Sequence, residues 1–94
     1  MLFEFDPEKD ESNIKKHGVS LADAELLDWQ TLKSYHADIR RYGESRQVGY
    51  AYLGKRLHAV IYTYREMTIR IISLRKANKR ERKWYESQAQ QTKT

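Results

Sequence analysis

LHAVIYTYREMTIRIISL, residues 57–74, determines the architecture of the sheet. Two runs rich in β-branched and aromatic residues, 57–64 and 67–74, flank the pair Arg65-Glu66. Such residues favour strands, and two strands separated by two residues form a tight hairpin. The segment therefore predicts two neighbouring antiparallel strands, joined by a turn at Arg65-Glu66.

The residues before this hairpin extend the same pattern. Residues 46–53 alternate, with Val48, Tyr50 and Tyr52 on one face, and Gly54-Lys55 is typical of a two-residue turn. Residues 31–35 also have strand character, whereas the polar residues 36–44 predict a loop. The chain from residue 31 to residue 74 thus predicts a meander of four strands.

Helix signals occupy the N-terminal third. After a short strand over residues 2–5, Asp6 can cap a helix whose first position is Pro7, and Gly18 is a suitable helix end. Ser20, with Asp23 three residues later, opens a second helix. Its core-facing residues are Leu21, Ala24, and Leu27 or Trp29. We expect this pair to form a helical hairpin on one face of the sheet.

A third helix is predicted over residues 77–88, with a thin apolar stripe of Ala77, Trp84 and Tyr85. Residues 88–94 are polar and predict a flexible tail. Helices on one face of an antiparallel sheet make an α+β fold. With 94 residues, the chain is expected to form a single domain over residues 1–94.

The positive charge is concentrated near the C-terminus. Residues 65–86 hold eight bases and three acids, so this segment alone carries the net charge of +5. A neutral body with one basic end implies a polyanionic partner, usually a nucleic acid. A basic helix face that is merely solvated is the alternative.

Several other classes of function are disfavoured. The chain has no cysteine, which excludes disulfides and favours the cytoplasm. No apolar run reaches the roughly 20 residues of a membrane span. The three histidines are far apart and no glycine-rich phosphate loop is present, so we expect neither a metal nor a cofactor.

Cleavage of RNA without a metal fits this composition. The 2′-hydroxyl attacks the adjacent phosphorus, and the enzyme supplies a base, an acid and cations for the phosphorane. Arginine suits the last role because its planar fork matches phosphate oxygens. We expect Arg70 and Arg75 to lie beside Arg65 at a strand end, with Glu44, His17 and Tyr64 as proton-transfer candidates. His17 could instead interact with the helix C-terminus, and Glu44 with a surface arginine.

Three stretches resemble the BrnT-type toxins. FEFDPEKDESNIKKHGVS, residues 3–20, resembles the opening of that family, with Phe5 in place of a tryptophan. Glu44 and Arg46 resemble its E-x-R motif. IRIISLRKANKRERKWYE, residues 69–86, resembles its R-I-I-S-A-R-K-A signature and the helix that follows, with Leu74 in place of an alanine.

The resemblance implies a small RelE-like α+β toxin of a type II toxin–antitoxin system, an endoribonuclease that stops translation. It also implies a BrnA-like ribbon-helix-helix antitoxin as partner, and repression of the toxin's own operon by a complex of two toxins and two antitoxins. Combining the resemblance with the chemistry, we predict the catalytic residues Glu44, Arg65, Arg75 and His17. The predicted RNA-binding residues are Lys16, Arg46, Arg70, Lys76, Lys79 and Arg80. A non-catalytic module that binds nucleic acid or the antitoxin, and so a degenerate toxin, is the alternative function.

Overall fold

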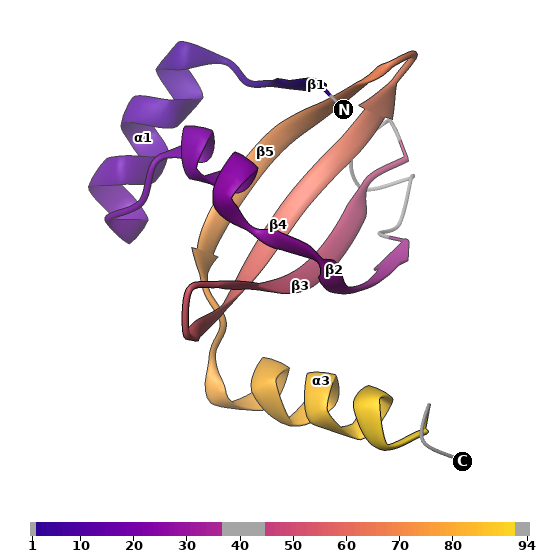
Figure 1. The fold of residues 1–94 in the computed structure, drawn as a ribbon. Coiled ribbons are helices and arrows are strands. Elements are labelled where there is room, and N and C mark those ends of the chain that lie inside the picture. The colour runs from indigo at the N-terminus through magenta and orange to yellow at the C-terminus, as the bar shows by residue number, and fades with distance from the viewer. Residues whose placement is uncertain (1, 37–44, 92–94) are drawn as a thin grey trace.

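The computed structural model describes residues 2–36 and 45–91, which form a five-stranded mixed sheet with helices (Figure 1). The strands lie in the order β1-β5-β4-β3-β2. In chain order the elements are β1 (Leu2–Glu4), α1 (Pro7–His17), the 3₁₀ helix η1 (Leu21–Leu26), β2 (Asp28–His36), β3 (Gln47–Leu53), β4 (Arg56–Arg65), β5 (Thr68–Lys76) and α3 (Lys79–Gln91).

The predicted meander is confirmed: β2, β3, β4 and β5 pair antiparallel in chain order. The β3–β4 turn is the expected Gly54-Lys55, since Leu53 pairs with Arg56 and Gly54 has a φ of 63°. The β4–β5 turn lies one residue later than predicted. Arg65 still pairs with Thr68, and Glu66 adopts the left-handed conformation with a φ of 52°.

The expectation of a wholly antiparallel sheet is wrong at one edge. β1 pairs parallel with β5, with Phe3 opposite Ile69. A tight hairpin forces two strands to run antiparallel, whereas a strand separated from its neighbour by a long connection is free of that constraint. β1 is such a strand, because α1, η1 and the meander separate it from β5 in the sequence.

The first helix has the predicted ends. The Asp6 side chain accepts a hydrogen bond from the Glu8 N–H at 2.9 Å, and Pro7 occupies the first turn. Gly18 ends the helix with a φ of 74°, a conformation that a side chain would strain.

The second predicted helix is a 3₁₀ helix, so the N-terminal pair is not an α-helical hairpin. Ser20 caps it as expected, accepting a hydrogen bond from the Ala22 N–H. Six residues are short for an α-helix, whereas 3₁₀ helices occur as such short pieces. The expected core residues Leu21, Ala24 and Leu27 are buried.

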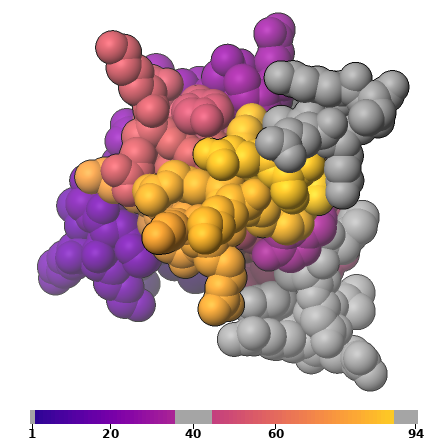
Figure 2. Space-filling model, turned by 90° about the horizontal axis from the view of Figure 1, so that it is seen from below, coloured from indigo at the N-terminus to yellow at the C-terminus, as the bar shows by residue number. Residues whose placement is uncertain are grey.

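The expectation that the helices lie on one face of the sheet is wrong, because they pack against both faces. One buried cluster, which includes Leu21, Val60 and Leu74, joins η1 to one face. A second cluster, which includes Tyr50, Leu57 and Tyr85, joins α3 to the other face. Figure 1 shows α3 running below the strands, and Figure 2 shows its yellow atoms across that lower side of the molecule. The alternation of apolar residues along β3 and β4 serves both faces.

The last helix starts two residues later than expected and continues to Gln91, into the segment predicted as a tail. Residues 37–44, most of the predicted loop, lie outside the described residues. No helix in the described ranges is long and apolar enough to cross a membrane.

Candidate nucleic-acid interface

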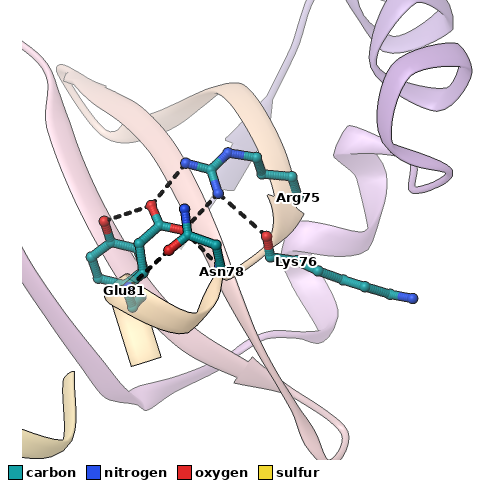
Figure 3. Close-up of polar contacts among 5 residues, drawn as sticks. Arg75, Lys76, Asn78 and Glu81 are labelled. Atoms are coloured by element: carbon teal, nitrogen blue, oxygen red, sulfur yellow. Dashed lines mark hydrogen bonds and ion pairs between the residues drawn. The ribbon is translucent and has the colours of Figure 1, made fainter. Parts of the chain in front are cut away.

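Arg75 and Glu81 form the central ion pair of the α3 side of the sheet (Figure 3). The two guanidinium nitrogens Nη1 and Nη2 lie 2.7 and 2.8 Å from the two carboxylate oxygens of Glu81. Arg75 Nη1 also donates to the Lys76 carbonyl oxygen at 3.3 Å. This bidentate contact fixes the plane of the Arg75 guanidinium.

Glu81 is itself fixed by a capping box at the start of α3. The Asn78 N–H donates to Glu81 Oε1 at 2.8 Å, and the Glu81 N–H donates to Asn78 Oδ1 at 2.9 Å. Each side chain therefore satisfies a backbone N–H of the first helical turn. The spacing N-x-x-E is a signal for this cap, and sequence reasoning overlooked both residues.

An aromatic wall borders the ion pair. The Tyr50 hydroxyl donates to Glu81 Oε2 at 3.0 Å, and the Trp84 ring lies 5.5 Å from that of Tyr50 and 5.6 Å from that of Tyr35. Burial, followed by the neighbouring Tyr35 and Glu81, raises the pKa of Tyr50 above its usual value. Tyr50 therefore stays a neutral hydrogen-bond donor.

The charges of the ion pair are stable at neutral pH. The hydrogen bonds from Arg75 are the main cause that lowers the pKa of Glu81 to about 2, against an opposing effect of burial. The same hydrogen bonds raise the pKa of Arg75. Both side chains are thus charged, and their opposite charges cancel at short range.

A bulge in β5 places Arg70 on the same face as Arg75. Ser73 pairs with Ile61 and Ile71 with Tyr62, so Ile72 is an extra residue. Ile71 and Leu74 both face the η1 cluster although they are three positions apart. Without the extra residue, Arg70 and Arg75 would point to opposite faces, because strand residues alternate.

Arg65 does not lie beside Arg75, contrary to expectation. Arg65 pairs with Thr68 at the start of β5, seven residues before Arg75. At roughly 3.3 Å per residue, the two positions are about 20 Å apart, so the two arginines are too far apart to bind the same phosphate. Arg70 lies near Arg65 instead, and its guanidinium is 3.7 Å from the Glu4 carboxylate.

Glu44 lies outside the described residues. The carbonyl oxygen of Ser45, the next residue, accepts a hydrogen bond of 2.8 Å from Thr63, which is the strand partner of Arg70. Lys16 and His17 lie on the other side of the sheet edge, where α1 meets β5. The remaining RNA-binding candidates are Arg46 just before β3, the exposed Lys76 at the end of β5, and the exposed Lys79 and Arg80 in the first turn of α3.

Within residues 2–36 and 45–91, no cluster of three or more histidine, aspartate or glutamate side chains could hold a metal ion.

The structure brings together Arg75, Glu81 and Tyr50 on one side, and Lys16 and His17 on another. Arg65 and Arg70 form a third group at the far end of β5.

Comparison with protein families yields a match. The family model described as the ribonuclease toxin, BrnT, of type II toxin-antitoxin systems matches residues 5–81. No curated protein matches the chain.

Proposed function

The chain belongs to the BrnT family of ribonuclease toxins of type II toxin–antitoxin systems, and from this premise we propose that it is a metal-independent endoribonuclease. It would cleave RNA and thereby inhibit translation and growth. The match over residues 5–81 is the observation that carries the proposal. The family implies the ribonuclease activity and the existence of an antitoxin, whereas the mechanism and the assignment of residues are our proposal.

The reaction is transesterification at one phosphodiester. A base removes the proton of the 2′-hydroxyl, and the 2′ oxygen attacks the adjacent phosphorus. The bond from phosphorus to the 5′ oxygen then breaks, and an acid protonates that oxygen. The products are a 2′,3′-cyclic phosphate and a 5′-hydroxyl, so neither water nor an oxidant is consumed.

Arg75 is the proposed cation for the phosphorane. Its side chain is 34% exposed, and Glu81 holds the guanidinium plane in place. Three of its five N–H groups point to Glu81 and Lys76, which leaves Nε–H and one Nη2–H for a phosphate oxygen. A cation that is already oriented needs no reorganisation when charge develops on the phosphorane.

Glu44 is the proposed general base, and His17 the alternative. The resemblance of Glu44 and Arg46 to the E-x-R motif of the family supports this choice. Arg70, five residues before Arg75 on β5, would bind a neighbouring phosphate of the RNA. The Arg65 guanidinium, which we predicted as catalytic, would hold RNA at the far end of β5.

The other basic residues would position the RNA strand. The junction of β5 and α3 is surrounded by Lys76, Lys79 and Arg80, and Arg46 lies just before β3. Lys16 would bind from the α1 side. Contacts of this kind to phosphates give affinity without sequence preference, and they weaken as salt rises.

A type II system pairs its toxin with an antitoxin. We propose that the antitoxin is BrnA-like, with a ribbon-helix-helix domain, and forms a complex of two toxins and two antitoxins. This complex would bind operator DNA and repress the operon. Toxin, antitoxin and RNA would be in the cytoplasm. The toxin itself would have a RelE-like architecture.

A non-catalytic binding module is the second candidate. One observation favours it: Arg75 is paired with Glu81, and Arg70 with Glu4. Each carboxylate reduces the positive charge that the arginine can offer to a transition state. A degenerate toxin with these pairs would bind RNA or the antitoxin and leave RNA intact.

Induced expression in bacteria separates the two candidates. The wild-type chain, Arg75→Ala and the matched control Arg56→Ala are expressed alone, and growth and total RNA are followed. Arg56 is exposed at the start of β4 and has no proposed role. We expect growth arrest with RNA fragments for wild type and Arg56→Ala, and relief of both by Arg75→Ala. Normal growth with intact RNA and folded wild-type protein would overturn the ribonuclease proposal.

A further inference from the structure

A basic hollow of about 270 Å³ lies between α1 and β5, apart from the Arg75–Glu81 pair. Two lysines, a histidine, two serines and an asparagine line it together with one apolar residue: Lys9, Lys16, His17, Ser12, Ser73, Asn13 and Ile72. None of its lining residues carries a carboxylate. It thus combines cations and hydroxyl donors, the groups that bind phosphate oxygens.

The walls of the hollow are held together by a buried amide. Asn13 is 6% exposed, and its Nδ2 donates to the carbonyl oxygens of Val19 at 2.9 Å and Leu74 at 2.7 Å. Its Oδ1 accepts from the Leu74 N–H at 3.3 Å. These hydrogen bonds connect α1 directly to β5. They therefore hold in place the backbone that carries the side chains on either side of Asn13.

The spacing along α1 directs its polar residues to one place. Residues 9, 12, 13 and 16 are separated by three or four positions, so they share one face of the helix. Asn13 at the centre of this face touches β5, and Lys9 and Lys16 lie one turn to either side. The extra residue of the β5 bulge, Ile72, and its neighbour Ser73 form the opposite wall.

The two lysines and the histidine of the hollow have no partner in the described part of the chain. No hydrogen bond or ion pair there involves the side chains of Lys9, Lys16 or His17. The nearby Asp10 carboxylate is occupied, since it accepts from the Ser20 hydroxyl at 2.9 Å and from the Leu21 N–H at 2.7 Å. The positive charge of the hollow is therefore not neutralised.

The helix dipole explains only part of this charge. Lys16 and His17 lie in the last turn of α1, where the negative end of the helix favours cations. Lys9 lies in the first turn, where the dipole disfavours a cation. A ligand with negative charge accounts for all three residues, whereas capping of the helix end accounts for two.

We propose that this hollow binds a backbone phosphate of single-stranded RNA, next to the phosphate held at Arg75. The inference rests on the proposed ribonuclease function and deepens it by adding a second binding point for the substrate. Since liquid water occupies about 30 Å³ per molecule, the hollow has ample room for a phosphate group. Lys9 and Lys16 would pair with its oxygens, and Ser12 would donate a hydrogen bond. Ser73 would donate to it in place of its 3.5 Å hydrogen bond to Asn13 Oδ1.

The position of the hollow suits a continuous RNA strand. In the described part of the chain, β1 pairs only with residues 68–70 of β5, and beyond them α1 borders the outer edge of β5 through the hydrogen bonds of Asn13 with Leu74. Ser73 lines the hollow, and Arg75 lies two residues further along on the α3 side. An RNA strand that passes outside α1 and around the end of β5 would place different phosphates at the hollow and at Arg75.

Binding of an uncleavable ligand tests the inference. A single-stranded 2′-O-methyl RNA oligonucleotide lacks the attacking hydroxyl, so it reports affinity whether or not the protein cleaves RNA. Its affinity is measured by fluorescence anisotropy for wild type, for Lys9→Gln/Lys16→Gln, and for the control Lys15→Gln/Lys55→Gln. The control removes the same two charges from exposed positions outside the hollow.

We expect the hollow variant to bind about tenfold more weakly, the usual effect of removing one charge-assisted hydrogen bond, and the control to change less than about twofold. The slope of log K against log salt should fall by about 0.7 for each phosphate that the variant no longer neutralises. Inorganic phosphate should shift the backbone amide resonances of Ser12, Lys16, His17 and Ser73 in wild type, and leave them unshifted in the hollow variant.

Equal weakening by the two double variants, or amide shifts confined to other residues, would overturn the inference. Tighter binding of a DNA duplex than of the oligonucleotide at this hollow would overturn the assignment to RNA. RNA cleavage by wild type with an unoccupied hollow would remove this inference and leave the ribonuclease function standing. Binding at the hollow without cleavage would overturn the ribonuclease function and leave the binding site standing.

Discussion

The carboxylate of Glu81 accepts two hydrogen bonds from the Arg75 guanidinium, 2.7 and 2.8 Å long. It accepts two more, from the Asn78 N–H and the Tyr50 hydroxyl. One side chain of α3 thereby connects β3, β5 and the cap of its own helix. The ion pair that orients the proposed catalytic arginine also holds α3 on the sheet, so function and stability share these atoms.

The first prediction concerns acid. The pKa of Glu81 is lowered from 4.5 to about 2 in the folded protein, so folding favours its ionised form. The resulting stability is complete above pH 4.5 and is lost as the pH falls towards 2. It amounts to roughly 2–3 kcal/mol, because Arg75 is one-third exposed and solvent reduces the full effect. Urea unfolding at pH 7, 4.5 and 3 measures this loss.

Glu81→Gln should be less stable at pH 7 and should lose less stability between pH 4.5 and 3 than wild type. Glu86→Gln is the control, since Glu86 is exposed on the same helix. Each variant removes one carboxylate from α3, so the difference between the variants isolates Glu81. The same pH dependence in both variants would contradict the assignment.

The second prediction concerns the rate of cleavage in vitro. Arg75→Ala should slow single-turnover cleavage of RNA a hundredfold or more, since removal of one oriented donor costs about 2.7–4 kcal/mol of barrier. Glu81→Gln loses the ion pair and keeps the arginine, so its rate should fall by less than about tenfold. Circular dichroism confirms that each variant is folded. If both variants lose activity to the same extent, Arg75 acts through the structure rather than on the phosphate.

The sequence predicts what short segments determine. The Asp6-Pro7 start and the Gly18 end of α1 are local signals, and the alternation along β3 and β4 predicts the meander. The parallel pairing of β1 and the hydrogen bond of Asn13 with Leu74 connect residues more than sixty positions apart. No local pattern encodes such pairings. The bulge is hidden as well, because the repeated isoleucines 71 and 72 leave no sign of which one is extra.

The candidate site follows the same division. The basic segment and the resemblance point to Arg75 as a candidate catalytic residue. The structure places it in β5, and Glu81 lies across the junction of β5 and α3. The distance between Arg65 and Arg75 depends on strand register, which composition does not reveal. Arg70 joins the face of Arg75 only because of the bulge. Residue types were therefore predictable, and their grouping was not.

The third prediction concerns Asn13. Asn13→Ala should lower the free energy of unfolding by roughly 3 kcal/mol, since it leaves the buried Leu74 N–H and C=O without their side-chain partner. Asn13→Asp should be at least as damaging, because a carboxylate cannot donate to the carbonyl oxygens of Leu74 and Val19. Urea unfolding compares both variants with Glu11→Ala, an exposed position on α1. A loss below about 1 kcal/mol for both Asn13 variants would show that α1 is held by other interactions.

The last prediction uses the bulge, where the chain has one residue more than a regular strand needs. Deleting Ile72 leaves Ile71 and Leu74 facing the η1 cluster, and Arg75 facing α3, since regular alternation then gives the same faces. We expect this variant to be soluble, to unfold cooperatively, and to retain a stable β4–β5 pair by amide hydrogen exchange. Deleting Ile72 and Ser73 together is the contrasting change. Leu74 then follows Ile71 directly, which turns Leu74 to the α3 side and Arg75 towards the core. The double deletion should abolish the folded state, as a shift of one residue reverses every side chain that follows. Equal damage by the single and the double deletion would mean that the bulge is itself required, through the wall that Ile72 forms beside α1.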